Sequence, residues 1–135
     1  MLSLKYIIVP FGAAFLSQCI KILIEFVKYK KISFVRFIDG MGGMPSTHSA
    51  LVSSISTIIY FNYGMSSLFA VTLIFSLITI YDSMGVRYES GKQAKMINKL
   101  TGGNLEEKIG HRPIETLAGV ILGIVFTLLI NLIKK

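Results

Sequence analysis

Four long apolar runs, separated by polar stretches, dominate the chain. Their approximate limits are residues 6–27, 46–63, 65–81 and 113–133. Each run is long enough to cross a hydrocarbon core of about 30 Å as an α-helix rising about 1.5 Å per residue. Unpaired backbone groups are costly in lipid and the runs show no alternation, so each run predicts a helix rather than a strand.

Two polar stretches, residues 28–45 and 82–112, lie between these runs. The second and third runs are joined only by a short turn near residues 62–64, which predicts an antiparallel helical hairpin. Within the second polar stretch, residues 88–100 predict an amphipathic helix that ends at Gly102-Gly103, with Ala94, Met96 and Ile97 facing lipid or protein. The predicted fold is therefore a single all-α domain over residues 1–135, a polytopic membrane helix bundle with an additional amphipathic loop helix.

The composition agrees with a membrane protein. Hydrophobic residues make up 53% of the chain, charged residues only 16%, and the mean hydropathy is +0.66, whereas a soluble domain has about 25% charged residues. The net charge of +7 comes from cations in the polar stretches. We therefore expect anionic lipid headgroups or phosphate substrates as partners rather than nucleic acid. The single cysteine, Cys19, excludes an internal disulfide.

Four spans place both polar stretches on one membrane face and both chain ends on the other. Ten cations lie in the polar stretches, whereas the opposite face carries Lys5, Lys134 and Lys135. The positive-inside rule therefore predicts that the polar stretches face the cytoplasm, with the protein in the plasma membrane.

One candidate chemical signal is Pro45-Ser46-Thr47-His48, at the start of the second run. Ser46 or Thr47 is a suitable helix cap, and the free N–H groups at such a helix start attract anions. His48 falls in the first turn. The purely structural alternative is that this segment only begins a helix and that His48 caps it or reaches the membrane surface.

A second signal is Gly110-His111-Arg112-Pro113-Ile114-Glu115. Proline is favoured at the first helical position, so a helix is expected to begin at Pro113. Glu115 lies four residues after His111 and can accept a hydrogen bond from its imidazole. Such a carboxylate fixes the tautomer and makes the other ring nitrogen a better nucleophile or base. The structural alternative is an interfacial pair that only satisfies itself.

Further charged residues lie near the same ends of the runs. Asp82 and Arg87 follow the third run and are expected to pair with each other. The first run carries a polar stripe at helical spacing, and ionisable residues inside a span should face the bundle or a wet cavity. This stripe consists of Gln18, Lys21, Glu25 and Lys28.

The predicted topology brings these groups to one membrane face. Helix starts, histidines and cations in one place indicate a phosphate site, and the residues collected there are His48, His111, Glu115, Asp82, Arg87, Lys21 and Glu25. No zinc-binding spacing, Walker loop or dinucleotide fingerprint occurs, so neither a metal nor a cofactor is predicted. The small residues Ser46, Ser49, Ser53, Ser56, Gly119 and Gly123 are expected to pack helices within or between protomers.

These motifs resemble those of a known superfamily. Pro45-Ser46-Thr47-His48 is similar to the P-S-G-H element of type-2 phosphatidic acid phosphatases and vanadium-dependent haloperoxidases, and His111 to Glu115 is similar to their later H-x-x-x-D element. Together with the segment from Asp82 to Tyr88, they make nearly the whole chain resemble the small divergent branch of that superfamily.

The resemblance implies a metal-independent phosphatase with a phosphohistidine intermediate, acting on a lipid phosphate or pyrophosphate. It implies His111 as the nucleophile, Glu115 as its orienting partner and His48 as the general acid. Ser46 and Thr47 would bind phosphate oxygens. Three cations, proposed from their place in the topology, would assist them, namely Lys21, Arg87 and Arg112.

The chain departs from the family pattern in several ways. Thr47 stands where glycine is usual, Glu115 replaces aspartate, the K-x6-R-P element is missing, and the better-known membrane members have more spans. Two other interpretations remain open, a non-catalytic module that binds anionic phospholipid and a structural helix-bundle subunit. Because so few short helices enclose a site poorly, a homo-oligomer is also expected.

Overall fold

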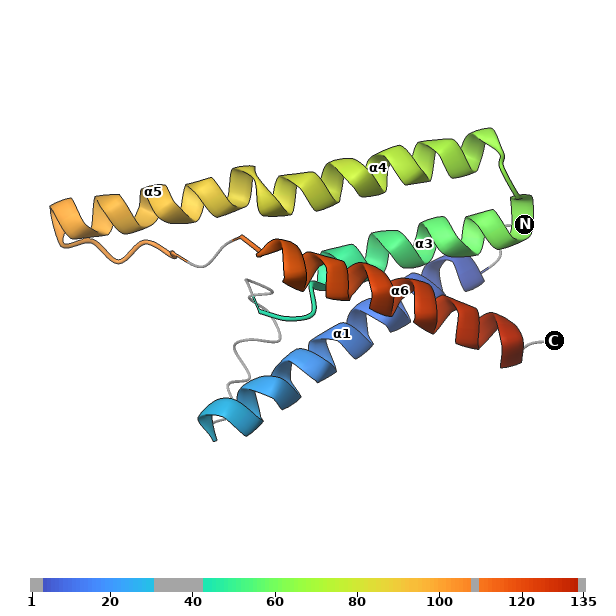
Figure 1. Cartoon of the computed structure of the whole chain (residues 1–135), viewed down its shortest axis with the longest axis horizontal. Helices are drawn as coiled ribbons and strands as arrows, with labels where there is room; N and C mark the ends of the chain where they lie inside the picture. Colours follow the sequence, from blue (N-terminus) through green and yellow to red (C-terminus); the bar gives the residue numbers. More distant parts are fainter. Residues whose placement is uncertain (1–3, 31–42, 108–109, 134–135) are drawn as a thin grey trace.

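The computed structural model describes residues 4–30, 43–107 and 110–133, and this part of the chain contains helices and no strand (Figure 1). The helices are α1 (Lys5–Tyr29), α3 (Thr47–Tyr63), α4 (Ser67–Met84), α5 (Val86–Thr101) and α6 (Pro113–Ile133). The prediction of an all-α membrane helix bundle is confirmed.

The local signals in the sequence mark the helix ends well. Ser46 caps α3, where its side chain accepts a hydrogen bond from the Ser49 N–H, and α6 begins at Pro113. Helix α5 ends at Gly102, whose φ of 69° is the left-handed conformation that glycine adopts without a steric penalty. Each predicted span coincides with a helix whose ends differ from the prediction by at most three residues.

Helix α3 is the centre of the bundle. It packs against α1, α4 and α6, and Figure 1 shows it lying between α4 on one side and α6 on the other. Small side chains let neighbouring helix backbones approach closely. The buried residues of α3 are accordingly mostly small, namely Ser49, Ala50, Val52, Ser53, Ser54, Ser56, Ile58 and Ile59.

The closest approach is between α3 and α6. A Cβ added to Gly119 would lie 2.3 Å from the Ser46 carbonyl oxygen, and one added to Gly123 would lie 2.1 Å from Ser53 Oγ and 2.3 Å from the Ala50 carbonyl oxygen. Neither position has room for a side chain. The sequence left open whether the serine and glycine stripes pair helices within or between protomers; these contacts lie within one chain.

Three helical stretches of the described chain are long and apolar enough to cross a membrane: Lys5–Lys28, Ser67–Thr101 and Pro113–Ile133. Helix α3, the span expected at 46–63, has 17 residues and is not among them. At about 1.5 Å per residue it still reaches about 26 Å. That α3 also crosses the membrane therefore stays a prediction.

The ends of the helices separate the bundle into two faces. Figure 1 shows both chain termini and the α3–α4 turn at one end, with the start of α3, the end of α4 and the start of α6 towards the other. This is the arrangement that the predicted topology requires. Much of the basic stretch at 28–45, including Arg36, lies outside the described residues, as does Lys108.

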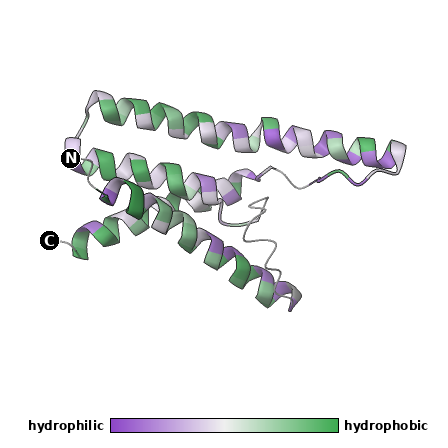
Figure 2. Cartoon of the chain, turned by 180° about the vertical axis from the view of Figure 1, so that it is seen from behind, coloured by the Kyte–Doolittle hydropathy of each residue, from purple (hydrophilic) through white to green (hydrophobic). Residues whose placement is uncertain are grey.

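Helix α5 continues from α4 beyond the bundle (Figure 1). Figure 2 shows hydrophobic residues on the bundle helices and many hydrophilic ones along α5, which contains the amphipathic helix expected at 88–100. Ala94 is buried, while Met96 and Ile97 are exposed. Of the predicted apolar residues, Ala94 therefore packs against protein, whereas Met96 and Ile97 lie on the exposed face of α5.

Candidate functional site

Backbone hydrogen bonds join three helix ends at one face of the bundle. The Ser46 N–H donates to the Glu115 carbonyl oxygen at 3.0 Å, which ties the start of α3 to the start of α6. The His111 N–H donates to the Ser83 carbonyl oxygen, also at 3.0 Å, which ties α6 to the end of α4. The segments carrying the two histidines are thus held together by main-chain contacts.

His111 is the buried member of the histidine pair, with 3% of its surface exposed. Its Nδ1 lies 3.2 Å from Glu115 Oε2, so the hydrogen bond predicted from the sequence is present. The same carboxylate oxygen accepts from the Arg112 N–H at 3.1 Å. Nε2 makes no hydrogen bond to any residue that the structure describes, so a tautomer with the proton on Nδ1 leaves the Nε2 lone pair available.

Burial lowers the pKa of His111 below its ordinary value of 6.5, and the hydrogen bond that His111 donates to Glu115 only partly opposes this effect. The positive charges of Lys21 and Arg87 act in the same direction as burial on that pKa. The imidazole is therefore neutral at neutral pH, which is the form a nucleophile requires.

The start of α3 is more accessible to solvent than the buried His111 imidazole. Ser46 Oγ is buried and accepts from the Ser49 N–H at 3.4 Å and the Ser49 hydroxyl at 2.9 Å. The N–H groups of Thr47 and His48, in the first helical turn, have no acceptor within the helix. N–H groups at the positive end of a helix dipole attract anions. The His48 side chain is exposed beside them.

Thr47 links this helix start to α1. Its hydroxyl donates to Gln18 Oε1 at 3.1 Å and lies 3.3 Å from Lys21 Nζ, which donates to it. Ser17 Oγ is 3.4 Å from the same oxygen and also donates to the Pro45 carbonyl at 3.1 Å. The side chains of Ser46 and Thr47, which were expected to bind phosphate oxygens, thus already have hydrogen-bond partners in the protein. The donors at this helix start that lack an acceptor within the helix are the backbone amides of Thr47 and His48.

Lys21 is almost fully buried, with 2% of its surface exposed. Its alkyl chain lies against Gly43, where an added Cβ would come within 3.4 Å of Cγ and Cδ. An ammonium group taken out of water requires compensating partners or a bound anion. The sequence prediction that Lys21 faces the bundle interior is confirmed.

Only some of the predicted charged residues lie close enough to the two histidines to act on them electrostatically. His48 lies within electrostatic range of Arg87, His111, Lys21 and Asp82, and Arg87 Nε pairs with Asp82 Oδ2 at 2.7 Å, as expected. Among the described residues, Glu25 and Arg112 are not principal charges acting on either histidine. Arg112 is exposed and Glu25 is half-buried on α1.

Several residues that support this face were given no role in the site by sequence reasoning. Ser17 and Gln18 hold Thr47, and the Ser83 carbonyl holds His111. An added Cβ on Gly110 would lie 2.4 Å from backbone atoms of Tyr88, so only glycine fits there. Gln18 stood in the recognised polar stripe, and Ser83 and Gly110 stood in the quoted motifs, whereas nothing in the sequence distinguished Ser17 from the other small residues.

No group of three or more His, Cys, Asp or Glu side chains within residues 4–30, 43–107 and 110–133 is arranged to hold a metal ion. The ionisable groups gathered here are instead two imidazoles, carboxylates and cations. Such a set can bind an oxyanion and transfer protons to and from it.

Comparison with known proteins matches residues 2–126 to a family described as the divergent PAP2 family. The chain is also 37% identical to the uncharacterized membrane protein YuiD of Bacillus subtilis (strain 168), in an alignment that covers 88% of this chain and 89% of the relative. No solved structure gives a significant match. The resemblance inferred from the motifs is confirmed.

Proposed function

The chain belongs to the divergent PAP2 family, and we propose that it is a membrane-embedded, metal-independent phosphatase that hydrolyses a lipid phosphate or pyrophosphate. The observation that supports this proposal most is the buried His111 imidazole, bonded to Glu115 through Nδ1 and close to the charges of Lys21 and Arg87. A neutral imidazole with one nitrogen held and the other available is a nucleophile, and the neighbouring cations suit a phosphoryl group.

In the first step, His111 Nε2 attacks phosphorus and the bond from phosphorus to the leaving oxygen breaks. His48 donates a proton to that oxygen, so the alcohol leaves neutral. In the second step, water attacks the phosphohistidine, His48 accepts a proton from the water, and the bond from phosphorus to nitrogen breaks. Inorganic phosphate leaves, and both histidines return to their starting states.

Charge builds up on the phosphoryl oxygens during each step. The groups suited to stabilise it are the Lys21 ammonium, the Arg87 guanidinium and the amides of Thr47 and His48 at the start of α3. Thr47 stands in place of the usual glycine, but its hydroxyl bonds Gln18 and Lys21. This direction of the side chain is compatible with phosphate approaching the amides.

The membrane setting completes the proposal. The helical membrane bundle and the similarity to a membrane protein support an integral membrane location. We place the site at the cytoplasmic face of the plasma membrane, because the cations of the polar stretches gather there under the positive-inside rule. Lipid phosphate is then the substrate, membrane lipids are the surroundings, and a homo-oligomer would shield the exposed apolar surface of so small a bundle.

The alternative of a purely structural subunit has less support. Its serine and glycine stripes are used within the chain between α3 and α6, and helix packing has no use for a held imidazole. The remaining alternative, a module that only binds anionic phospholipid, predicts binding without turnover. A single experiment therefore separates the two.

The purified protein, in detergent, would be incubated with phosphatidic acid, polyprenyl phosphate and polyprenyl pyrophosphate, with EDTA present throughout. We expect phosphate release that is unaffected by EDTA, and a phosphohistidine at position 111 trapped by a quench that avoids acid. The His111→Ala variant controls for contaminating phosphatases. Lipid binding with no release from any substrate would overturn the proposal in favour of the binding module.

A further inference from the structure

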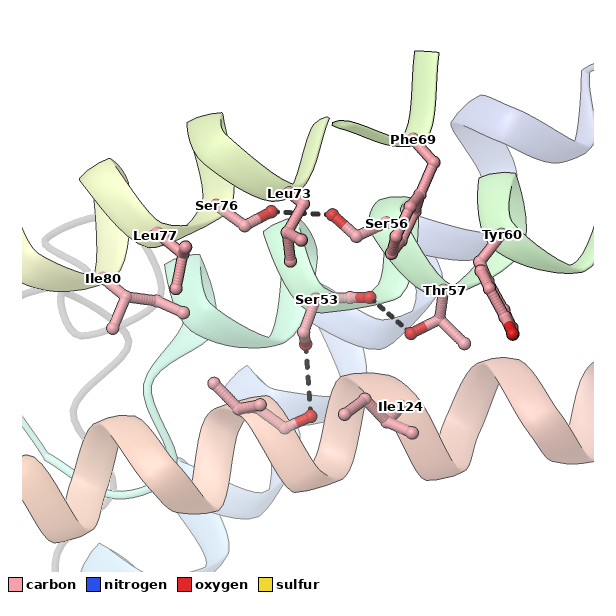
Figure 3. A pocket seen from close by; sticks show the side chains of 11 residues that line it. Ser53, Ser56, Thr57, Tyr60, Phe69, Leu73, Ser76, Leu77, Ile80 and Ile124 are labelled. Atoms are coloured by element: carbon pink, nitrogen blue, oxygen red, sulfur yellow. Dashed lines mark hydrogen bonds between the residues drawn. The ribbon is translucent and has the colours of Figure 1, made fainter. Parts of the chain in front are cut away.

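An apolar groove runs along the bundle between α4 and α6, with α3 as its floor. Its volume is about 340 Å³, within the usual range for small-molecule sites. Figure 3 shows Leu73, Leu77 and Ile80 of α4 on one side and Ile124 of α6 on the other. Leu73, Leu77 and Ile124 are each more than a third exposed, so the groove opens sideways to the surroundings of the bundle.

The groove lies where hydrocarbon is expected. Both walls belong to helices long and apolar enough to cross a membrane. From Ile80 to Phe69 the groove follows α4 for eleven residues, about 16 Å at 1.5 Å per residue. Because α4 runs from Ser67 to Met84, this length lies across the middle of the span, and the opening faces the hydrocarbon region of a bilayer.

The floor of the groove carries hydroxyl groups, but their hydrogens are already used. Ser53 Oγ donates to the backbone carbonyl of Ala50 or of Val120, each at 3.2 Å, and Thr57 Oγ1 donates to the Ser53 carbonyl at 2.7 Å. A hydroxyl has one hydrogen to donate. This part of the floor has none left for a ligand.

The hydroxyls of Ser56 and Ser76 are paired as well, which leaves the Tyr60 hydroxyl, at the end of the groove, as the remaining one. Ser76 Oγ donates to the carbonyl of Val52 or Thr72, and it lies 2.8 Å from Ser56 Oγ, which donates to it. The groove therefore offers a ligand mostly methyl and methylene contacts. A chain without polar groups matches this surface, whereas a polar ligand would lose its own hydrogen bonds.

One end of the groove continues toward the candidate site. A second hollow of about 610 Å³, which includes Asp82, shares Leu77 and Ile80 with the groove. Asp82 pairs with Arg87, and both act electrostatically on His48. The apolar surface thus leads from the hydrocarbon region to the charges beside the imidazole.

Aromatic rings line the other end of the groove. Tyr60 and Phe69 both line the groove, and their ring centroids are 5.1 Å apart. Figure 3 shows these two side chains at the end of the groove away from Ile80. They limit how far an occupant can extend from the site.

From this continuity, we infer that the groove binds the hydrocarbon chain of the lipid whose phosphate lies at His48 and His111, and that Tyr60 and Phe69 select its length. The inference rests on the proposed function for the position of the phosphate. The chain is an acyl or an isoprenoid group, which share the chemistry that the groove recognises. The substrate thus enters sideways from the bilayer between α4 and α6.

A matched pair of substitutions on α4 tests the groove. Leu73→Trp fills it, whereas Ile74→Trp adds the same bulk at a neighbouring exposed position that does not line it. Dioleoyl phosphatidic acid, with acyl chains, and a long polyprenyl phosphate, with an isoprenoid chain, would be assayed separately. We expect Leu73→Trp to lower kcat/KM at least tenfold on the one whose type of chain the groove binds. With dihexanoyl phosphatidic acid, Ile74→Trp should match the unsubstituted protein, and the loss in Leu73→Trp should be smaller than on the long substrates. Equal kcat/KM values for Leu73→Trp and Ile74→Trp on both long substrates would refute binding of the hydrocarbon chain in the groove, but would not contradict the proposed phosphatase function.

A readout independent of turnover separates the two proposals. A lipid phosphate with a diazirine in mid-chain would be photolysed with the protein in lipid nanodiscs, and the labelled residues found by mass spectrometry. We expect labels on Leu73, Leu77 and Ile124, lost in Leu73→Trp and kept in Ile74→Trp, even if no phosphate is released. Labels spread evenly over exposed apolar residues, or cross-links showing a second copy seated between α4 and α6, would overturn the inference.

The length limit has its own matched pair. Phe69→Ala opens the far end of the groove, whereas Phe75→Ala removes an exposed ring outside it. We expect Phe69→Ala to shift the preferred chain length upward by several carbons and Phe75→Ala to leave it unchanged. An unchanged preference in Phe69→Ala would refute the role of the aromatic end.

Discussion

The starts of α3 and α6 both carry a histidine near the first turn, yet they are built differently. At the start of α6, the Glu115 carboxylate accepts hydrogen bonds from the Arg112 N–H and from the buried His111 ring. At α3, the Ser46 hydroxyl caps the helix, the next two amides have no acceptor within it, and His48 is exposed. One helix start holds an imidazole, and the other leaves room for an anion.

This difference indicates a division of labour under the proposed function. A nucleophile needs a fixed tautomer and one attack direction, which burial and Glu115 supply to His111. A general acid needs access to the leaving group and to water, which an exposed His48 has. The hydrogen bond from the Ser46 N–H to the Glu115 carbonyl keeps these unlike helix starts together.

The largest expected effect separates the two imidazoles. We expect His111→Ala to lower phosphate release by about 10³-fold or more on every ester, because the nucleophile is lost. His48→Ala should lower release by about 10²-fold to 10⁴-fold with alkyl esters and far less with p-nitrophenyl phosphate, whose leaving group needs no proton. Initial rates on both substrate types measure this. The same dependence on the leaving group in both variants would contradict the division of labour.

The next effect concerns the charge between the two helix starts. Lys21→Met keeps most of the alkyl packing but removes the buried ammonium beside Thr47. Because one donor to a phosphoryl transition state is lost, we expect kcat to fall by about 10²-fold. Lys28→Met, at an exposed position of the same helix, is the matched control. A kcat no lower than that of the control would remove Lys21 from the site.

A smaller effect is expected from Glu115→Gln. The hydrogen bond and charge of Glu115 raise the pKa of His111 against the lowering by burial, so their loss lowers that pKa further. Activity requires neutral His111 and falls as pH drops through its pKa. The acidic limb of the kcat/KM profile should therefore begin below pH 6.5 and move to still lower pH in the variant. We also expect a rate loss of about 10-fold to 100-fold, as for other carboxylates that orient a histidine. A limb that moves to higher pH would contradict this account.

The smallest effect concerns the cap of α3. Ser46→Ala should lower the free energy of unfolding by about 1 kcal/mol through loss of the cap, as measured by denaturation in detergent. Ser66→Ala is the matched control, because Ser66 caps α4 in the same manner by accepting from the Phe69 N–H. Weaker inhibition by inorganic phosphate in Ser46→Ala than in Ser66→Ala would instead indicate that the Ser46 hydroxyl itself contacts phosphate.

Much of the site could be predicted because its decisive contacts are local. The hydrogen bond between His111 and Glu115 follows from helical spacing, and the cap by Ser46 follows from its place before an apolar run. The contacts of Thr47 with Gln18 and Lys21 could not be predicted, since they join helices α1 and α3 across 29 and 26 residues. Their partners depend on how the helices cross, which periodicity does not specify.

Local sequence signals specify where the helices begin and end and that they form a membrane bundle, because apolar length, caps and glycines act within a few residues. The central position of α3, and its close packing against Gly119 and Gly123 of the same chain, follow from tertiary packing and are not specified by those signals. The groove that remains between α4 and α6 follows from tertiary packing as well. These outcomes depend on which faces of the helices meet, and several pairings of small-residue stripes satisfy the same sequence pattern.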